Sequence, residues 1–407
     1  MNLNSLWPAA GALLVAATAV FLCDKLFGVH SSSVVNAKTN GQGSRHIVLN
    51  GLRGLVIFSV FMHHATIFHG FLRTGLWLTS QSYLQVHLGI NKVFVLFMLS
   101  GFLFTTKLLN AKANAAQPFN WLQFYVSRTM RLVPVYFFML WIVFAMIAVI
   151  SDFTLKEPAS ELFKHIIQWA SFTLFGAPKV NEFELTAIAG VVWSLPYEWF
   201  FYFMLPLLAW VFRMPISMPY LILAMAASAC LVIWQPLWDF MSGFAFGAAM
   251  ALIVRVPRLV QICSGRMGVV LVVVCLTLAA TAFPTGMALG SRIFIFLAVT
   301  VMACGNSLMG LLKLRLFQSM GERSYSIYLL HSVVMYVMFK FAIGARSATL
   351  SGSEHWLVIL ASIAVFIPLC YFTYRWIEQP FIRYAPYLSN WLSNQVRKYQ
   401  SAFVVIR

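Results

Sequence analysis

Residues 51–71 read GLRGLVIFSVFMHHATIFHGF, an apolar segment interrupted by one arginine and three histidines. About 20 apolar residues suffice to cross a bilayer as an α-helix, so this segment predicts a membrane span. Arg53 and His64 are eleven positions apart, which places them on nearly the same helix face with a rise of roughly 16 Å. We expect the arginine near one membrane edge and the histidine near the midplane. The alternative is a snorkelling arginine and an unrelated polar histidine.

The rest of the chain is equally apolar. Of 407 residues, 61% are hydrophobic and 10% are charged, against about 25% charged in an ordinary soluble domain. Apolar segments of span length recur, which predicts an all-α, polytopic integral membrane helical bundle. About eleven spans are expected, near residues 6–23, 48–70, 86–106, 132–150, 190–212, 217–234, 238–254, 267–285, 292–312, 324–343 and 356–375.

The first predicted span stands apart from the others. A linker over residues 24–47, which contains three consecutive serines and three glycines, separates it from the next span. The segment could be a signal sequence, but its start, MNLNSLWP, has no lysine or arginine, and no clear cleavage site follows. We therefore expect residues 1–45 to form an accessory transmembrane helix and its linker.

Positive charge alternates between successive connections. By the positive-inside rule, the cation-rich connections are cytoplasmic, which puts the C-terminus in the cytoplasm and the N-terminus on the opposite side of the membrane. The net charge of +17 then reflects topology, and a nucleic-acid partner is not expected because no soluble basic domain is present. The cations expected inside include Lys25, Lys38, Arg45, Lys107, Lys112, Arg128, Arg131, Arg213, Arg255, Arg258, Arg266, Lys313, Arg315, Arg323, Arg375, Arg383, Arg397 and Lys398.

The cysteines argue against a metal site or a disulfide framework. Six are present, they are scattered, and none forms a CxxC pair. No P-loop and no GxGxxG segment opens a helix. Any chemistry must therefore reside in or beside the membrane.

Two segments place polar or small residues inside a predicted helix or at its entry. Ser100 and Gly101 lie in FMLSGFLF, where small residues favour close helix packing; the functional alternative is close approach of a substrate. Arg128 and Arg131 are three apart, hence on one helix face, and Pro134 follows. Arginines at a cytoplasmic entry are expected from topology alone, but the pair would also suit a phosphate or pyrophosphate.

Three further polar residues are candidates for a site. Glu198 is an acid well inside an apolar segment, with Ser194 four positions before it on the same face; such carboxylates are usually functional, although pairing with an arginine is the structural alternative. His331 lies in a predicted helix with Ser324 seven residues earlier, and a lone buried histidine is more often structural. Glu378 is flanked by arginines, which favours a salt-bridged end of the final helix.

Taken in order, these segments resemble the acyltransferase-3 family of integral membrane O-acyltransferases, over about residues 46–383. Each motif alone is weak, but the ordered set is specific. The matching residues are Arg53 and His64 (Arg-x10-His), Ser100 to Leu103 (SGFL), Arg128, Arg131 and Pro134 (RxxRxxP), Trp193 to Glu198 (WSLxxE), Ser324 to His331 (SYSxYLxH) and Glu378 to Phe381 (ExPF).

The resemblance implies a domain organisation. Family members have ten core helices, so the eleven spans would be an acyltransferase-3-like core at 46–383 plus the N-terminal helix, with residues 384–407 as a short cytoplasmic tail. Some members carry an extracytoplasmic SGNH domain. No such domain is recognisable in this sequence, so we expect no second catalytic domain.

The resemblance also implies an activity, the transfer of an acyl group, often acetyl, from cytoplasmic acyl-CoA to an extracytoplasmic acceptor such as a sugar hydroxyl. We expect Arg53, Arg128 and Arg131 to hold the phosphates of the donor acyl-CoA, with no permanently bound cofactor. His64 would act as general base, because imidazole titrates near neutral pH, or would itself be acylated. Glu198 would orient a histidine or bind acceptor hydroxyls.

A membrane transporter is the alternative from another functional class. In that interpretation His64 and Glu198 form a proton relay. A proton-coupled carrier would not need the arginines, although an anion carrier would. The acceptor and the length of the acyl chain are not readable from the sequence.

Overall fold

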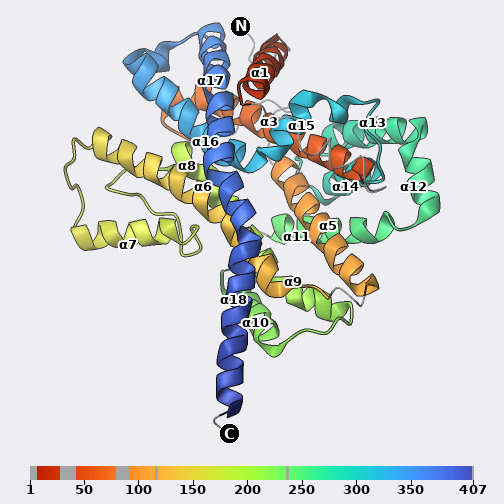
Figure 1. Cartoon of the computed structure of the whole chain (residues 1–407). Helices are drawn as coiled ribbons and strands as arrows, with labels where there is room; N and C mark the ends of the chain where they lie inside the picture. Colours follow the sequence, from red (N-terminus) through yellow and green to blue (C-terminus); the bar gives the residue numbers. More distant parts are fainter. Residues whose placement is uncertain (1–6, 28–42, 79–90, 115–117, 235–237, 406–407) are drawn as a thin grey trace.

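The computed structural model describes residues 7–27, 43–78, 91–114, 118–234 and 238–405, which are all-α apart from one isolated bridge between Val180 and Phe183 (Figure 1). Most of the expected linker, residues 28–42, lies outside the described residues. The α-helices are α1 (Trp7–Leu26), α3 (Gly43–Thr74), α5 (Asn91–Ala113), α6 (Trp121–Ile150), α7 (Ala159–Ala170), α8 (Thr186–Ala189), α9 (Leu195–Val211), α10 (Met218–Trp234), α11 (Trp238–Ile253), α12 (Pro257–Ser264), α13 (Arg266–Thr281), α14 (Leu289–Ala303), α15 (Arg315–Glu322), α16 (Ser324–Val337), α17 (Gly352–Thr373) and α18 (Gln379–Val405). The short 3₁₀ or π segments are η1 (Gly190–Ser194), η2 (Leu311–Lys313), η3 (Met338–Ile343), η4 (Gly344–Thr349) and η5 (Tyr374–Glu378).

Each predicted span contains an apolar helix, which confirms the all-α polytopic bundle. Among the described residues, seven helices are long and apolar enough to cross a membrane, and α11 with α12 forms a further pair bent by 102°. Helices α10, α13 and α14 are shorter but apolar. Large apolar side chains on these helices, such as Met225, Val273 and Ile293, are exposed, as expected for surfaces that face lipid.

The start of α6 and the end of α14 differ from the predicted helix boundaries. Helix α6 starts earlier than expected, at Trp121, because the Asn120 side chain caps it by accepting from the backbone N–H of Gln123 at 2.9 Å. Arg128 and Arg131 consequently lie inside a helix rather than at its entry. Helix α14 ends earlier than expected, at Ala303, because the chain turns at Gly305 with φ +106°.

The predicted final helix, near residues 356–375, continues beyond its expected end. Helix α17 continues through the π-helical η5 into α18, which runs to Val405 and extends away from the bundle (Figure 1). Pro380, the second residue of α18, would clash with the carbonyl four residues earlier in a regular helix. The wider π turn directly before it accommodates the proline, so the helix continues instead of stopping.

Glycines bring together the helices that will carry the site. A Cβ on Gly101 would lie 2.3 Å from the Phe244 carbonyl oxygen, and one on Gly247 would lie 2.1 Å from that of Met98, so α5 and α11 are in backbone contact. A Cβ on Gly54 would lie 1.9 Å from the Phe317 carbonyl oxygen, which makes α3 equally close to α15. The role of Gly101 is therefore helix packing, the first of the two interpretations of the SGFL segment.

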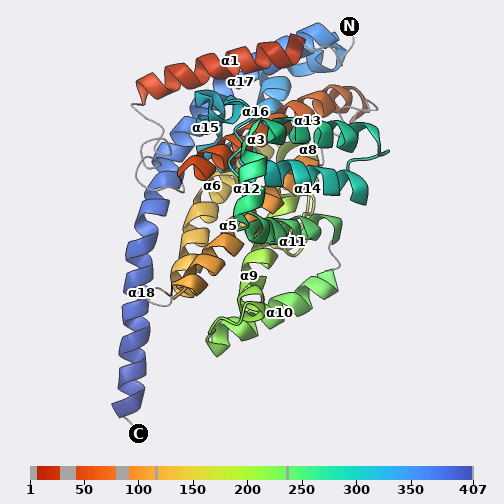
Figure 2. The same ribbon diagram turned by 90° about the vertical axis from the view of Figure 1, so that its right-hand side faces the viewer.

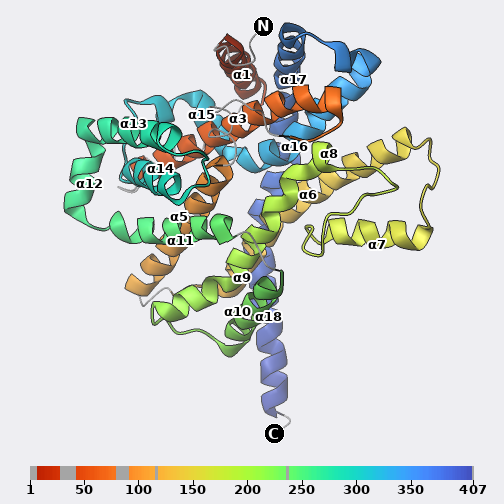
Figure 3. The ribbon, with the colours of Figure 1, turned by 180° about the vertical axis from the view of Figure 1, so that it is seen from behind.

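The helices are grouped around α3 and α16. Helix α16 packs against α3, α6, α8 and α17, and Figure 3 shows α6 and α8 beside it. Helix α7 lies next to α6 at one side of the bundle in both Figure 1 and Figure 3. Helix α1 lies along α17 at the end of the bundle opposite to the C-terminus (Figure 2).

Candidate active site

One cavity, here called the arginine cavity, lies among α3, α5, α6, α9 and α16 and has a volume of about 110 Å³. Helix periodicity brings its lining together: Arg128 and Arg131 come from one face of α6, and residues spaced by three and four come from α5. The predicted site residues that line it are Arg53, Ser100, Arg128, Arg131, Ser194 and Glu198. The structure thus gathers residues that are up to 145 positions apart in the sequence.

Polar contacts fix the arginines in this cavity. The guanidinium of Arg128 lies 5.1 Å from the centroid of the Phe104 ring, a cation–π distance. Arg131 Nε is 3.9 Å from Glu378 Oε1, while Ser326 donates to Glu378 Oε2 at 2.9 Å. Glu378 is completely buried, and its partner is Arg131 on α6 rather than the arginines that flank it in sequence. Glu378 lies in η5, within the continuous helical segment from α17 to α18, and contacts Arg131 of α6 from there.

The cavity has a surplus of positive charge. Three guanidinium groups face it, and Glu198, which accepts a hydrogen bond from Tyr202 at 3.0 Å, supplies one carboxylate. Guanidinium groups bind phosphate and carboxylate oxygens bidentately. The arrangement suits a ligand with phosphate groups.

His64 and His331 form a hydrogen-bonded pair. The distance between His64 Nδ1 and His331 Nε2 is 2.6 Å, and the rings are parallel within 7° with centroids 4.9 Å apart. His331 Nδ1 lies 2.8 Å from the Tyr328 carbonyl oxygen and 3.1 Å from that of Ile327. Helix α16 therefore positions His331, and His331 positions His64.

The proton positions in this pair follow from its partners. Carbonyl oxygens only accept hydrogen bonds, so His331 Nδ1 carries a proton and, in the neutral ring, Nε2 is an acceptor. His64 Nδ1 must then be the donor, which leaves the lone pair on His64 Nε2. No other hydrogen-bond partner of His64 occurs in the described part of the chain. With its proton on Nδ1 and its lone pair on Nε2, His64 can remove a proton from a ligand.

His64 also lines a second cavity, here called the indole cavity, of about 390 Å³. Its wall contains the indoles of Trp77, Trp169 and Trp193 and the carboxylate side chain of Glu184. The His64 and Trp77 rings are 5.7 Å apart between centroids. The cavity is thus largely aromatic, with a potential base at its edge.

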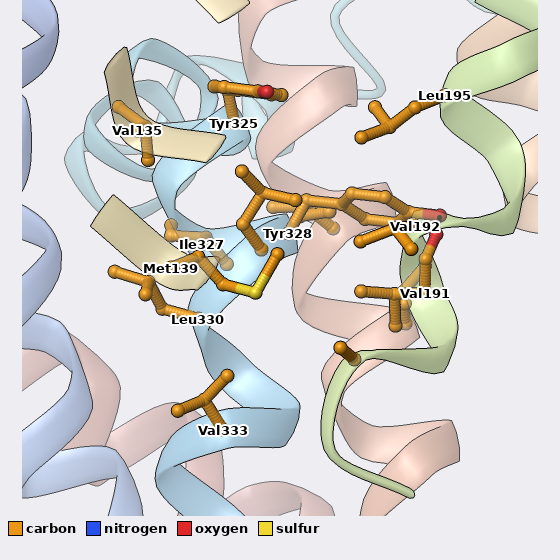
Figure 4. Close-up of a cluster of buried hydrophobic side chains, with 14 of the residues drawn as sticks. Val135, Met139, Val191, Val192, Leu195, Tyr325, Ile327, Tyr328, Leu330 and Val333 are labelled. Atoms are coloured by element: carbon orange, nitrogen blue, oxygen red, sulfur yellow. Dashed lines mark hydrogen bonds between the residues drawn. The ribbon is translucent and has the colours of Figure 1, made fainter. Parts of the chain in front are cut away.

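A thin wall separates the two cavities. Tyr328, which lines the arginine cavity, donates to the carbonyl oxygen of Val191 at 2.8 Å, and Val191 lines the indole cavity. Because the single hydroxyl proton of Tyr328 is used there, Ser194 Oγ donates to Tyr328 Oη at 2.8 Å. Figure 4 shows Tyr328 reaching from α16 to the segment of Val191 and Val192.

The apolar core next to this wall keeps it in position. Val135 and Met139 of α6 and Ile327 and Leu330 of α16 pack together on the other side of α16 (Figure 4). All four are almost fully buried. Close packing of this kind resists rotation of α16, so Tyr328 is held against η1.

Glu198 and His64 lie in different cavities. The hydrogen-bond partner of Glu198 is Tyr202, and that of His64 is His331. The expectation that Glu198 orients a histidine is therefore not met in the described structure, because His331 occupies that position. Of the adjacent histidines, His64 pairs with His331, whereas His63 Nδ1 has no partner among the described residues.

Sequence reasoning missed Lys92. It is 9% exposed, and its Nζ donates to the Ser59 carbonyl oxygen at 2.8 Å. Its charge is close enough to His63 and His64 to act on both imidazoles. A lysine inside an apolar segment was the available signal. Of the tryptophans in the indole cavity, Trp193 begins the WSLxxE motif, whereas Trp77 and Trp169 gave no signal because they lie in separate segments outside the motifs.

The acyltransferase-3 family model, described as an acyltransferase domain, matches residues 46–375. The chain belongs to the acyltransferase-3 family. The protein is thus a membrane acyltransferase, and this assignment replaces the transporter alternative. Neither the curated proteins nor the solved structures include a significant match to the chain.

Proposed function

We propose that this acyltransferase moves an acyl group, in the simplest case acetyl, from cytoplasmic acyl-CoA to a hydroxyl of an extracytoplasmic sugar or glycan. The observation that carries the proposal is the His64–His331 pair, which leaves a lone pair on His64 Nε2 at the edge of an aromatic cavity. The arginine cavity adjoins it across the contact between Tyr328 and Val191.

The arginine cavity is the proposed donor site. Coenzyme A carries several phosphate charges, which match the guanidinium groups of Arg53, Arg128 and Arg131. A cavity of about 110 Å³ is smaller than coenzyme A, so part of the donor would extend beyond it toward the cytoplasm. The thioester would point at the wall formed by Tyr328. For the acyl group to reach His64, the Tyr328 side chain would have to leave the Val191 carbonyl oxygen while the packed helix α16 stays in place.

The indole cavity is the proposed acceptor site. Indole rings offer flat apolar faces against which the C–H face of a sugar ring packs, and Glu184 can accept hydrogen bonds from hydroxyl groups. With about 390 Å³, the cavity has room for a sugar unit. Candidate acceptors are an O-antigen, an exopolysaccharide, peptidoglycan, a periplasmic glucan and a small natural product.

The chemical step then needs one base. His64 Nε2 removes the acceptor hydroxyl proton while the oxygen attacks the thioester carbonyl carbon. The carbon–sulfur bond breaks, and the sulfur takes the proton from His64, which gives an ester and free coenzyme A. General-base catalysis of this type contributes about 10²–10⁴-fold. The alternative, in which His64 carries the acyl group between two half-reactions, uses the same lone pair.

The orientation of the chain belongs to the same proposal. Lys107, Lys112, Arg255 and Arg383 lie in connections or helix ends that the positive-inside rule assigns to the cytoplasm. The acyl donor would then enter from the cytoplasmic face of a bacterial inner membrane. The N-terminus would be periplasmic and the C-terminus cytoplasmic.

Inside-out membrane vesicles supplied with radiolabelled acetyl-CoA test the proposal. We expect alkali-labile label in the glycan or lipid fraction, and none in vesicles with His64→Ala at equal abundance. Label that stays on the protein until an acceptor is added would identify the acylated-histidine route. If the wild-type vesicles transfer no label, acetyl-CoA is not the donor or the glycan is not the acceptor.

A further inference from the structure

Helix α1 is built into the bundle, although it lies outside the matched family region. Its buried residues Ala12, Ala16, Val20 and Cys23 follow helical spacing, and they belong to the same core cluster as α3, α6 and α16. The partner helix is α17: a Cβ on Gly11 would lie 3.6 Å from the side chain of Leu360. Figure 2 shows α1 running along α17. These small side chains allow the two helices to approach closely.

At the end of α1, Asp24 is 6% exposed and accepts two hydrogen bonds. Arg315 Nε donates to Asp24 Oδ2 at 2.6 Å, and the Tyr371 hydroxyl donates to Asp24 Oδ1 at 2.6 Å. A carboxylate removed from water is costly unless such partners hold it. Asp24 therefore joins α1 to α15 through Arg315 and to α17 through Tyr371.

The connection continues to the start of α16. Because Tyr371 gives its proton to Asp24, Ser319 donates to Tyr371 Oη at 2.5 Å. Arg323 Nη1 in turn donates to Ser319 Oγ at 2.8 Å and to the Ser319 carbonyl oxygen at 2.9 Å. The Arg323 guanidinium also lies over the Tyr371 ring, 3.7 Å from its centroid. Every proton in this chain of hydrogen bonds points from the cation at Arg323 toward the anion at Asp24.

Arg323 is directly next to the site. It is 2% exposed and precedes Ser324 and Tyr325, both of which line the arginine cavity. The same helix carries Tyr328 and His331 further along. A shift of Arg323 would therefore move one wall of the arginine cavity.

We infer that α1 is a positioning element of the donor site and that Asp24 is its positioning residue. Through Tyr371, Ser319 and Arg323, Asp24 fixes the α15–α16 junction and with it the wall formed by Ser324 and Tyr325. The inference rests on the proposed function, since it assumes that the arginine cavity takes acyl-CoA. It replaces the expectation that the first helix is accessory.

The test compares full-length wild-type protein with Asp24→Asn, purified in detergent, by equilibrium binding of radiolabelled acetyl-CoA. Loss of the charged acceptor should weaken binding about tenfold. It should also raise the KM for acetyl-CoA while the KM for the acceptor stays unchanged, a split that general destabilisation would not give. Lys25→Ala, which alters the exposed neighbour on α1, is the matched control and should bind as wild type.

Tyr371→Phe is the second variant, for the case that Asp24→Asn does not accumulate. It keeps the ring beneath Arg323 and removes the hydroxyl that links α17 to Asp24 and Ser319, so binding should weaken by a smaller factor. If wild type binds acetyl-CoA and both variants bind it equally well, the inference about α1 is wrong. If wild type does not bind acetyl-CoA, the proposed donor is wrong.

A readout that does not depend on the donor uses two native cysteines. Cys23 on α1 and Cys370 on α17 are both buried. Maleimide labelling, located by mass spectrometry, should be slow at both in wild type and faster in Asp24→Asn, with exposed Cys230 as the reference. Unchanged protection in Asp24→Asn would show that Asp24 does not hold α1 in place.

Discussion

The arginine cavity and the indole cavity adjoin the same wall but differ in chemistry. The first presents three guanidinium groups, one carboxylate and several hydroxyls, whereas the second is lined mainly by indoles and by backbone of η1. Charge recognises the polar end of a ligand, and aromatic surface recognises its apolar faces. The difference suggests two substrates that approach from opposite sides and meet at Tyr328 and His64.

The largest expected effect is at the meeting point. His64→Ala removes the proposed general base. Transfer should therefore fall by about 10²–10⁴-fold, while the protein still inserts and folds. The measurement is acyl transfer per inserted molecule. His63→Ala is the matched control, because His63 lies about 100° around the helix, and it should lose much less activity. The reverse order would assign the chemistry to the other histidine.

The second effect concerns how the base is held. His331→Ala should lower kcat by about tenfold to 100-fold, since a small misplacement of a reacting group is costly, with little change in either KM. His331→Gln should retain more activity, because its amide oxygen can still accept from His64 Nδ1. Ser332→Ala, an equally buried neighbour, is the control. Equal activity of the Ala and Gln variants would mean that the hydrogen bond is not what positions His64.

The third effect separates the two cavities by substrate. Arg53→Lys keeps the charge but loses the planar fork, so the KM for acyl-CoA should rise about tenfold and the KM for the acceptor should not. Arg128→Ala should act in the same direction. Arg266→Lys, at an exposed position outside the cavity, should change neither. If Arg53→Lys changed the acceptor KM instead, the assignment of the cavities would be reversed.

The smallest effect is expected in the indole cavity. Trp193 is 37% exposed and lines it, so Trp193→Ala should raise the KM for the acceptor about threefold to tenfold, the range of one aromatic contact. Trp210→Ala on the outer surface of α9, where the residue is 63% exposed, is the control. Unchanged kinetics of Trp193→Ala would remove the main argument for a sugar in this cavity.

Local pattern was enough for the helices and for part of the site. Runs of apolar residues predicted each span, because span length and the need to satisfy backbone hydrogen bonds leave few alternatives in a bilayer. Isolated ionisable residues in those runs identified Arg53, Arg128, Arg131 and Glu198, which the structure brings into one cavity. The ordered motifs identified the family that residues 46–375 match.

The same reasoning failed where an outcome depends on contacts between distant segments. It assigned the orientation of a histidine to Glu198, because periodicity says nothing about which helix faces which. It ended the final helix near residue 375, before Pro380, because a single sequence does not reveal that a π turn will accommodate the proline. It also gave no sign that Asp24 of α1 contacts Arg315 and Tyr371, because these residues meet only after folding.

The sequence by itself determined that the chain is a membrane bundle of apolar helices that carry a few ionisable residues. Hydropathy and helical spacing can be read from neighbouring residues, so they need no knowledge of the tertiary structure. Only the tertiary structure decided that His64 pairs with His331, that Glu198 joins the arginines, and that three tryptophans line the same cavity as His64. Those contacts depend on how close helix backbones approach, and that is set by glycines such as Gly54 and Gly101 meeting carbonyl oxygens far away in the chain.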